Sequence, residues 1–233
     1  MDNDCYSWDG ANGSQEVAFG NTVMIRFGAR ISYKIVDEGE VWRLWAAAFI
    51  HASEDHITGN LVAILPFIYI CEMVMGKFAT LAIYMLAAAG GSLVPSVLGS
   101  YWSVGASGSV LGFIGATTSI FIVNKSGMRP ETCFVIFAPL MVSSYFQLVG
   151  NLAAIGGTTD VLAHLGGYVF GMLTGNICCP VLAHDGIKVD YEYAAKVRAV
   201  SAYILAGLTA LLVLGMWVIR DYELDAFEWC YSL

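Results

Sequence analysis

The stretch from Gly105 to Val123 reads GASGSVLGFIGATTSIFIV and contains no charged side chain. A helix of about 18 such residues rises about 1.5 Å per residue and crosses the roughly 30 Å hydrocarbon core of a bilayer. This stretch predicts a membrane span over about 106–123, and similar apolar runs predict five more, at about 54–75, 78–98, 132–149, 161–182 and 199–219. We therefore expect an all-α, polytopic transmembrane helical bundle of six spans.

The composition of the whole chain agrees with this interpretation. Of its 233 residues, 58% are hydrophobic and only 13% are charged, whereas about 25% of a soluble domain is charged. The charges gather in the first 56 residues, the last 14 and short patches between the apolar runs. We expect a loop segment over 1–50, a membrane domain over 51–219 and a short acidic tail over 220–233. The net charge of -8 comes largely from the termini, so it indicates no nucleic-acid partner.

Strongly polar side chains inside membrane spans are costly and are therefore candidates for function. His56 and Asn60 lie near the start of the first predicted span, Ser107 at the start of the third and His164 at the start of the fifth. Odd-numbered spans all begin on the same side of the membrane. These side chains are therefore predicted to share one membrane level.

Glycine spacing sharpens this prediction. On the fifth span, His164 forms one stripe with glycines at intervals of three, four and four residues, namely Gly167, Gly171 and Gly175. On the third span, Ser107 borders a second stripe, made of Gly108, Gly112 and Gly115. Glycine stripes let membrane helices approach closely, so packing of the two stripes would bring Ser107 towards His164. A hydroxyl beside a neutral imidazole is a nucleophile with its general base.

A serine nucleophile also needs donors for an oxyanion. His56 and Asn60 are four residues apart and share a helix face, and the Ser107 N–H at a helix N-terminus is a further candidate. His51 would lie about 140° round the helix from His56, so we expect it to point elsewhere and to have a structural role. The six cysteines show no metal-ligand spacing, and this chemistry needs no metal or cofactor.

Each residue alone has a simpler interpretation. A serine among small residues usually packs helices together, a membrane histidine can be structural, and Glu40 and Arg43 could lie in a solvated loop. The polar residues could also line a channel or transporter pathway. A transporter is expected to show internal symmetry, which we do not find in the sequence.

Four motifs resemble those of the rhomboid family of intramembrane serine proteases. They are GEVWR at 39–43, HASEDHITGN at 51–60, GASG at 105–108 and AHLGG at 163–167 with Asp160 before it. They occur in the family's order and cover roughly residues 28–180. The resemblance implies a Ser107–His164 dyad without a third acid, and an oxyanion hole formed by His56, Asn60 and the Ser107 N–H. Near the site it implies structural roles for His51, Glu40, Arg43, Gly105, Gly108, Gly167 and Gly171.

The resemblance also implies cleavage of membrane-protein substrates within or beside a transmembrane helix, on the luminal or extracellular side. The charges of the short loops place the same side away from the cytoplasm. The last span matches the extra C-terminal helix of eukaryotic secretase-type members, whereas residues 1–50 contain no counterpart of the family's first core helix. Leu111 stands where the family often has an aromatic residue. The alternative within the family is an inactive, client-binding relative.

Overall fold

The computed structural model describes residues 21–98, 102–127, 131, 160–182 and 189–218. The elements in chain order are α1 (Asn21–Phe27), β1 (Arg30–Ile31), α2 (Ser32–Val36), α3 (Arg43–Ala46), the 3-10 turn η2 (Ala47–Phe49), α4 (Glu54–Met75), α5 (Lys77–Leu98), β2 (Trp102–Ser103), α6 (Ser107–Val123), the 3-10 turn η3 (Lys125–Gly127), α8 (Val161–Cys178) and α9 (Tyr191–Val218).

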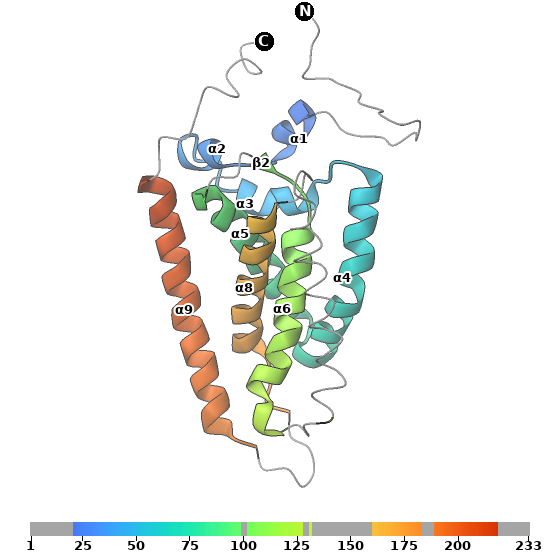
Figure 1. The fold of residues 1–233 in the computed structure, drawn as a ribbon, viewed down its shortest axis with the longest axis vertical. Coiled ribbons are helices and arrows are strands. Elements are labelled where there is room, and N and C mark those ends of the chain that lie inside the picture. The colour runs from blue at the N-terminus through green and yellow to red at the C-terminus, as the bar shows by residue number, and fades with distance from the viewer. Residues whose placement is uncertain (1–20, 99–101, 128–130, 132–159, 183–188, 219–233) are drawn as a thin grey trace, which may run out of the picture.

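Four of the described helices are long and apolar enough to cross a membrane, namely α4, α5, α8 and α9. The apolar helix α6 is slightly shorter, at 17 residues. Figure 1 shows the long helices running side by side, with α1, α2, α3 and β2 gathered at the end where α4, α6 and α8 begin. The predicted helical membrane bundle is therefore confirmed, while the span predicted at 132–149 lies outside the described residues.

Two helices differ in extent from the spans predicted for them, for local reasons. Helix α8 ends at Cys178 and not at residue 182, because Cys179 is extended before Pro180, and the residue before a proline disfavours the helical conformation. Helix α9 begins at Tyr191 and not at residue 199. The carboxylate of Asp190 accepts a hydrogen bond from the Tyr193 N–H at 2.9 Å and caps a polar first turn that hydropathy does not detect.

The glycine stripes of α6 and α8 pack directly against each other. A methyl group added to Gly167 would lie 2.0 Å from the Gly108 carbonyl oxygen, and one added to Gly171 would lie 2.1 Å from the Gly112 carbonyl oxygen. The two backbones are therefore in contact along one face, as the spacing predicts. Lipid provides no hydrophobic drive between helices, so such close packing holds them together.

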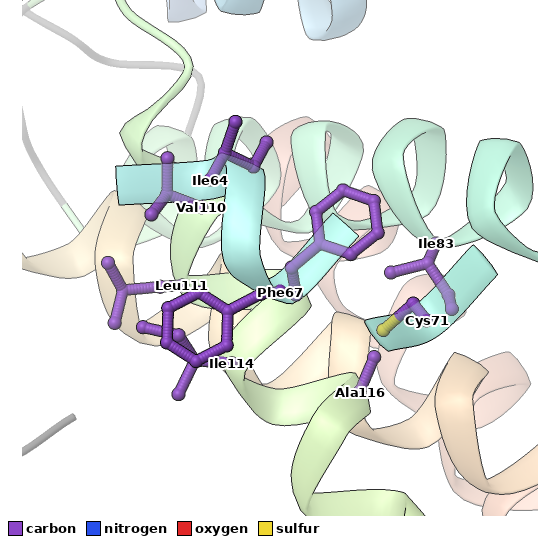
Figure 2. Close-up of a cluster of buried hydrophobic side chains, with 9 residues drawn as sticks. Ile64, Phe67, Cys71, Ile83, Val110, Leu111, Ile114 and Ala116 are labelled. Carbon is purple, nitrogen blue, oxygen red and sulfur yellow. The ribbon is translucent and has the colours of Figure 1, made fainter. Parts of the chain in front are cut away.

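Helix α4 packs on α6 and α5 through larger side chains. Figure 2 shows this cluster, which contains Ile64, Phe67 and Cys71 from α4, Ile83 from α5, and Val110, Leu111, Phe113, Ile114 and Ala116 from α6. A second cluster joins α9 to α5 and α8 through Leu212, Met216, Leu93 and Phe170. Apolar side chains remain exposed on α4 and α9, and in a membrane they would contact lipid.

The segment before α4 forms a folded cap at one end of the bundle. Strand β1 pairs antiparallel with β2, with Arg30 opposite Ser103. The Arg43 side chain is only 3% exposed and donates to the carbonyl oxygens of Ile25 (2.7 Å) and Ala29 (2.9 Å) and to the Glu40 carboxylate. The solvated-loop interpretation of Arg43 is therefore wrong, since burial of its guanidinium requires these acceptors.

Candidate active site

Ser107 is the first residue of α6 and is reached through a tight turn after β2. Gly105 has a φ of +120°, a conformation that side chains rarely adopt. A methyl group on Gly105 would also lie 2.6 Å from Cε1 and 2.7 Å from Nε2 of His56, and 3.7 Å from Nδ2 of Asn60. The glycine thus lets the peptide chain before Ser107 pass directly against His56 and Asn60.

His56 and Asn60 lie one turn apart near the start of α4. The Ser53 hydroxyl caps this helix by accepting a hydrogen bond from the His56 N–H at 3.2 Å. Asn60 Nδ2 is buried and has no hydrogen-bond partner among the described residues. Leaving a buried donor unsatisfied costs about 1–3 kcal/mol, so this amide is a donor available to a ligand oxygen.

His164 lies in the first turn of α8 and is 3% exposed. Asp160 caps this helix, because its Oδ1 accepts a hydrogen bond from the Ala163 N–H at 3.0 Å. A methyl group on Gly108 would lie 3.3 Å from the Ala163 carbonyl oxygen. The backbones of Gly108 and Ala163 are therefore in contact between α6 and α8. Ser107 precedes Gly108 in the sequence, and His164 follows Ala163.

The structure corrects the expected orientation of His51. Helix α4 begins at Glu54, so His51 precedes it and the helical angle between His51 and His56 does not apply. The two rings pack edge to face, with centroids 5.1 Å apart. His51 Nε2 accepts a hydrogen bond from the Ala106 N–H at 3.3 Å. His51 thus contacts both the His56 ring and the residue before Ser107.

Burial and the neighbouring His56 both lower the pKa of His51 below its ordinary value of 6.5. A neutral imidazole is the form that can accept the Ala106 N–H.

Among the described residues, no group of three or more His, Cys, Asp or Glu side chains could hold a metal ion.

Arg30 is a residue of this neighbourhood that the sequence pattern does not predict. Its guanidinium is 0% exposed and faces the Asp160 carboxylate, with 3.5 Å between its NH2 nitrogen and Oδ2. Asp160 belongs to the motif around His164, but its partner is 130 positions earlier in the chain. Hydropathy treats Arg30 only as a charge that interrupts an apolar run.

Taken together, the described geometry gathers a serine hydroxyl, a buried imidazole and several hydrogen-bond donors at the starts of α4, α6 and α8. Residues 38–181, more than half of the chain, match the family model described as the Rhomboid domain. This chain belongs to the rhomboid family.

Curated relatives agree with this membership. RHOMBOID-like protein 6, mitochondrial, of Arabidopsis thaliana is 28% identical, over 91% of this chain and 72% of its own length. RHOMBOID-like protein 1 of the same plant is 30% identical, over 89% of this chain and 56% of its own. Rhomboid protease AarA of Providencia stuartii is 27% identical, over 90% of this chain and 78% of its own. The family includes proteases and acts on membrane-protein substrates within the bilayer. The chain is accordingly an integral membrane protein of the rhomboid type.

Proposed function

We propose that this chain is an intramembrane serine endopeptidase that cleaves transmembrane segments of membrane proteins through a Ser107–His164 dyad. The observation that carries the proposal is the backbone contact between α6 and α8 beside these two residues, at the membrane level where His56 and Asn60 also lie. A packing serine would not need a buried histidine and an unsatisfied amide donor beside it. The relative that is named a rhomboid protease, AarA of Providencia stuartii, supports the same reaction class.

In the proposed reaction, Ser107 Oγ attacks a peptide carbonyl carbon of the substrate while its proton passes to His164. The carbonyl oxygen becomes an oxyanion, which accepts hydrogen bonds from the His56 side chain, Asn60 Nδ2 and the Ser107 N–H. His164 then protonates the leaving amine, and an ester links Ser107 to the substrate. Water hydrolyses this ester, with His164 again acting as the base, and the serine hydroxyl is restored.

We further propose that the starts of α4, α6 and α8 face the lumen or the extracellular side, as the charges of the short loops indicate. Residues 1–50 would then form a loop segment on that side, residues 51–219 the membrane domain and residues 220–233 a tail. An epitope at either end of the chain, tested for protection in sealed membranes, would check this orientation. Reaction of the tag with an impermeant reagent only after permeabilisation of microsomes would support it, and reaction in intact microsomes would contradict it.

The decisive experiment compares cleavage of a transmembrane reporter in membranes by the wild-type chain and by its Ser107→Ala and His164→Ala forms. Ser109→Ala is a matched control, because the Ser109 hydroxyl lies on the same helix and donates to the Tyr84 carbonyl oxygen at 3.2 Å. We expect cleavage by the wild type and the control, and none by the dyad variants. Labelling with a fluorophosphonate probe should follow the same order.

Two outcomes would overturn the proposal. Equal cleavage by the wild-type and Ser107→Ala chains would show that another group performs the reaction. If the folded wild-type chain neither labels nor cleaves but still binds membrane-protein clients, the chain would instead be an inactive member of the family.

A further inference from the structure

The buried guanidinium of Arg30 is bonded to several separate segments of the chain. Its Nε donates to the Ser103 hydroxyl at 3.0 Å, and its NH1 donates to the hydroxyls of Ser32 at 3.3 Å and Ser96 at 3.4 Å. Its NH2 pairs with the Asp160 carboxylate at 3.5 Å. Burial of a cation is costly unless it is paired and hydrogen-bonded. Arg30 therefore stays buried only while β2, α5 and the start of α8 are held around it.

The positions of two of these partners relate Arg30 to the dyad. Ser103 is the last residue of β2 and lies four residues before Ser107. Asp160 lies four residues before His164. A single planar group thus joins the segment that leads into Ser107 to the segment that leads into His164. Since the arginine fork has a fixed geometry, it fixes the separation of those two segments.

Asp160 divides its two oxygens between the two tasks. Its Oδ1 caps α8 by accepting the Ala163 N–H, while its Oδ2 faces Arg30. The cap needs only an oxygen acceptor, whereas the pair with Arg30 needs a negative charge. Asparagine at this position would keep the cap and remove the charge, so the two tasks can be separated by experiment.

The charge state of Arg30 suits this arrangement. Burial lowers the pKa of Arg30 from 12.5 to about 10, and the Asp160 carboxylate opposes that shift. A guanidinium with this pKa is still charged at neutral pH.

We propose that Arg30, paired with Asp160, is a positioning residue that holds the Ser107 turn and the start of α8 in register. The inference rests on the proposed function for its consequence in catalysis, but the positioning itself is a structural property. Arg30 does not contact substrate in this scheme. Its loss allows Ser107 and His164 to move apart, and a misplacement of about 1 Å can cost about 100-fold in rate.

The test combines the rate of fluorophosphonate labelling of Ser107 with hydrogen exchange of the backbone amides, both in the full chain. The variants are Arg30→Gln, Asp160→Asn and their double form. Lys34→Gln is the matched control, because Lys34 is a cation on the same cap that pairs with Glu38 at 2.8 Å. Asp160→Asn is the variant least expected to unfold, since it keeps the helix cap.

We expect each single variant to label Ser107 about tenfold more slowly or worse. The double form should be at most about threefold slower than the slower single variant, because both substitutions break the same interaction. Exchange should accelerate together at residues 102–106 and 161–164 and stay unchanged in α9. The Lys34→Gln control should match the wild type in both measurements.

The proposal is overturned if folded Asp160→Asn labels at the wild-type rate. It is also overturned if the labelling rate of the double form is slowed by the product of the two single-variant factors. A third contrary result is exchange that accelerates only in residues 21–37. A folded wild-type chain that does not label would refute the proposed function alone. In that case the exchange measurement still decides whether Arg30 holds the two segments together.

Discussion

The most demanding test of the α6–α8 contact is the replacement of Gly167 by alanine. The added methyl group would lie 2.0 Å from the Gly108 carbonyl oxygen and 2.5 Å from its carbonyl carbon, both backbone atoms. Ordinary van der Waals contact begins at 3.4 Å. The helices must therefore separate by about 1.4 Å, the difference between 3.4 and 2.0 Å, at the residue next to Ser107.

This displacement is large compared with what catalysis tolerates. A misplacement of about 1 Å can cost about 100-fold in rate, so we expect kcat/KM for a transmembrane reporter to fall about 100-fold or more. Overpacking of a close contact also costs about 1–3 kcal/mol of stability. Thermal unfolding in detergent would measure the loss of stability, and fluorophosphonate labelling of Ser107 would measure the loss of activity.

Gly207→Ala is the matched control in this experiment. Gly207 lies inside α9, and a methyl group added there meets no atom within 4 Å among the described residues. Alanine in a helix is favoured over glycine by about 0.5–1 kcal/mol, so this variant should cleave normally and unfold no earlier. If Gly167→Ala cleaved and unfolded like the wild type, α6 and α8 could not pack as described, and the reasoning would be refuted.

Three further predictions concern single polar side chains. Asn60→Ala should lower cleavage by about 100- to 1,000-fold, as loss of an oxyanion donor does, without lowering the unfolding temperature, because Asn60 Nδ2 has no described partner to lose. The wild type should lose stability relative to His51→Gln as the pH falls below about 6.5, measured by thermal unfolding. The pKa of His51 is lowered in the fold, so the unfolded chain takes up this proton first. Asn124→Ala should destabilise the fold by about 1–3 kcal/mol, because its side chain bonds the backbones of Ile120, Pro180 and Leu182.

Each of these predictions has a contrary result. Undiminished cleavage by Asn60→Ala would remove the amide from the oxyanion site. Parallel pH profiles for the wild type and His51→Gln would mean that His51 does not accept the Ala106 N–H. Asn124 lies at the opposite end of α6 from Ser107. If the folded Asn124→Ala variant failed to label at Ser107, the purely structural role of Asn124 would be contradicted.

The sequence alone predicts a helical membrane protein, and it predicts that the candidate site residues share one level of the membrane. Hydropathy marks the apolar part of each predicted span, because lipid excludes charge over a fixed thickness. The parity of the spans then places His56, Asn60, Ser107 and His164 on one side. Glycine periodicity predicts which helix faces meet, because the helical repeat is a local property. These inferences need no knowledge of how the chain folds back on itself.

The tertiary structure alone decided the contacts that depend on distant segments. Arg30 meets Ser96 and Ser103 across 66 and 73 positions, and His51 meets Ala106 across 55. Hydropathy treats Arg30 as one more interrupting charge. Helical spacing places His51 away from His56, because it assumes a helix that in fact begins three residues later. Whether a cation is solvated or buried depends on which acceptors the fold brings around it. No local pattern carries that information, so only the packed chain reveals it.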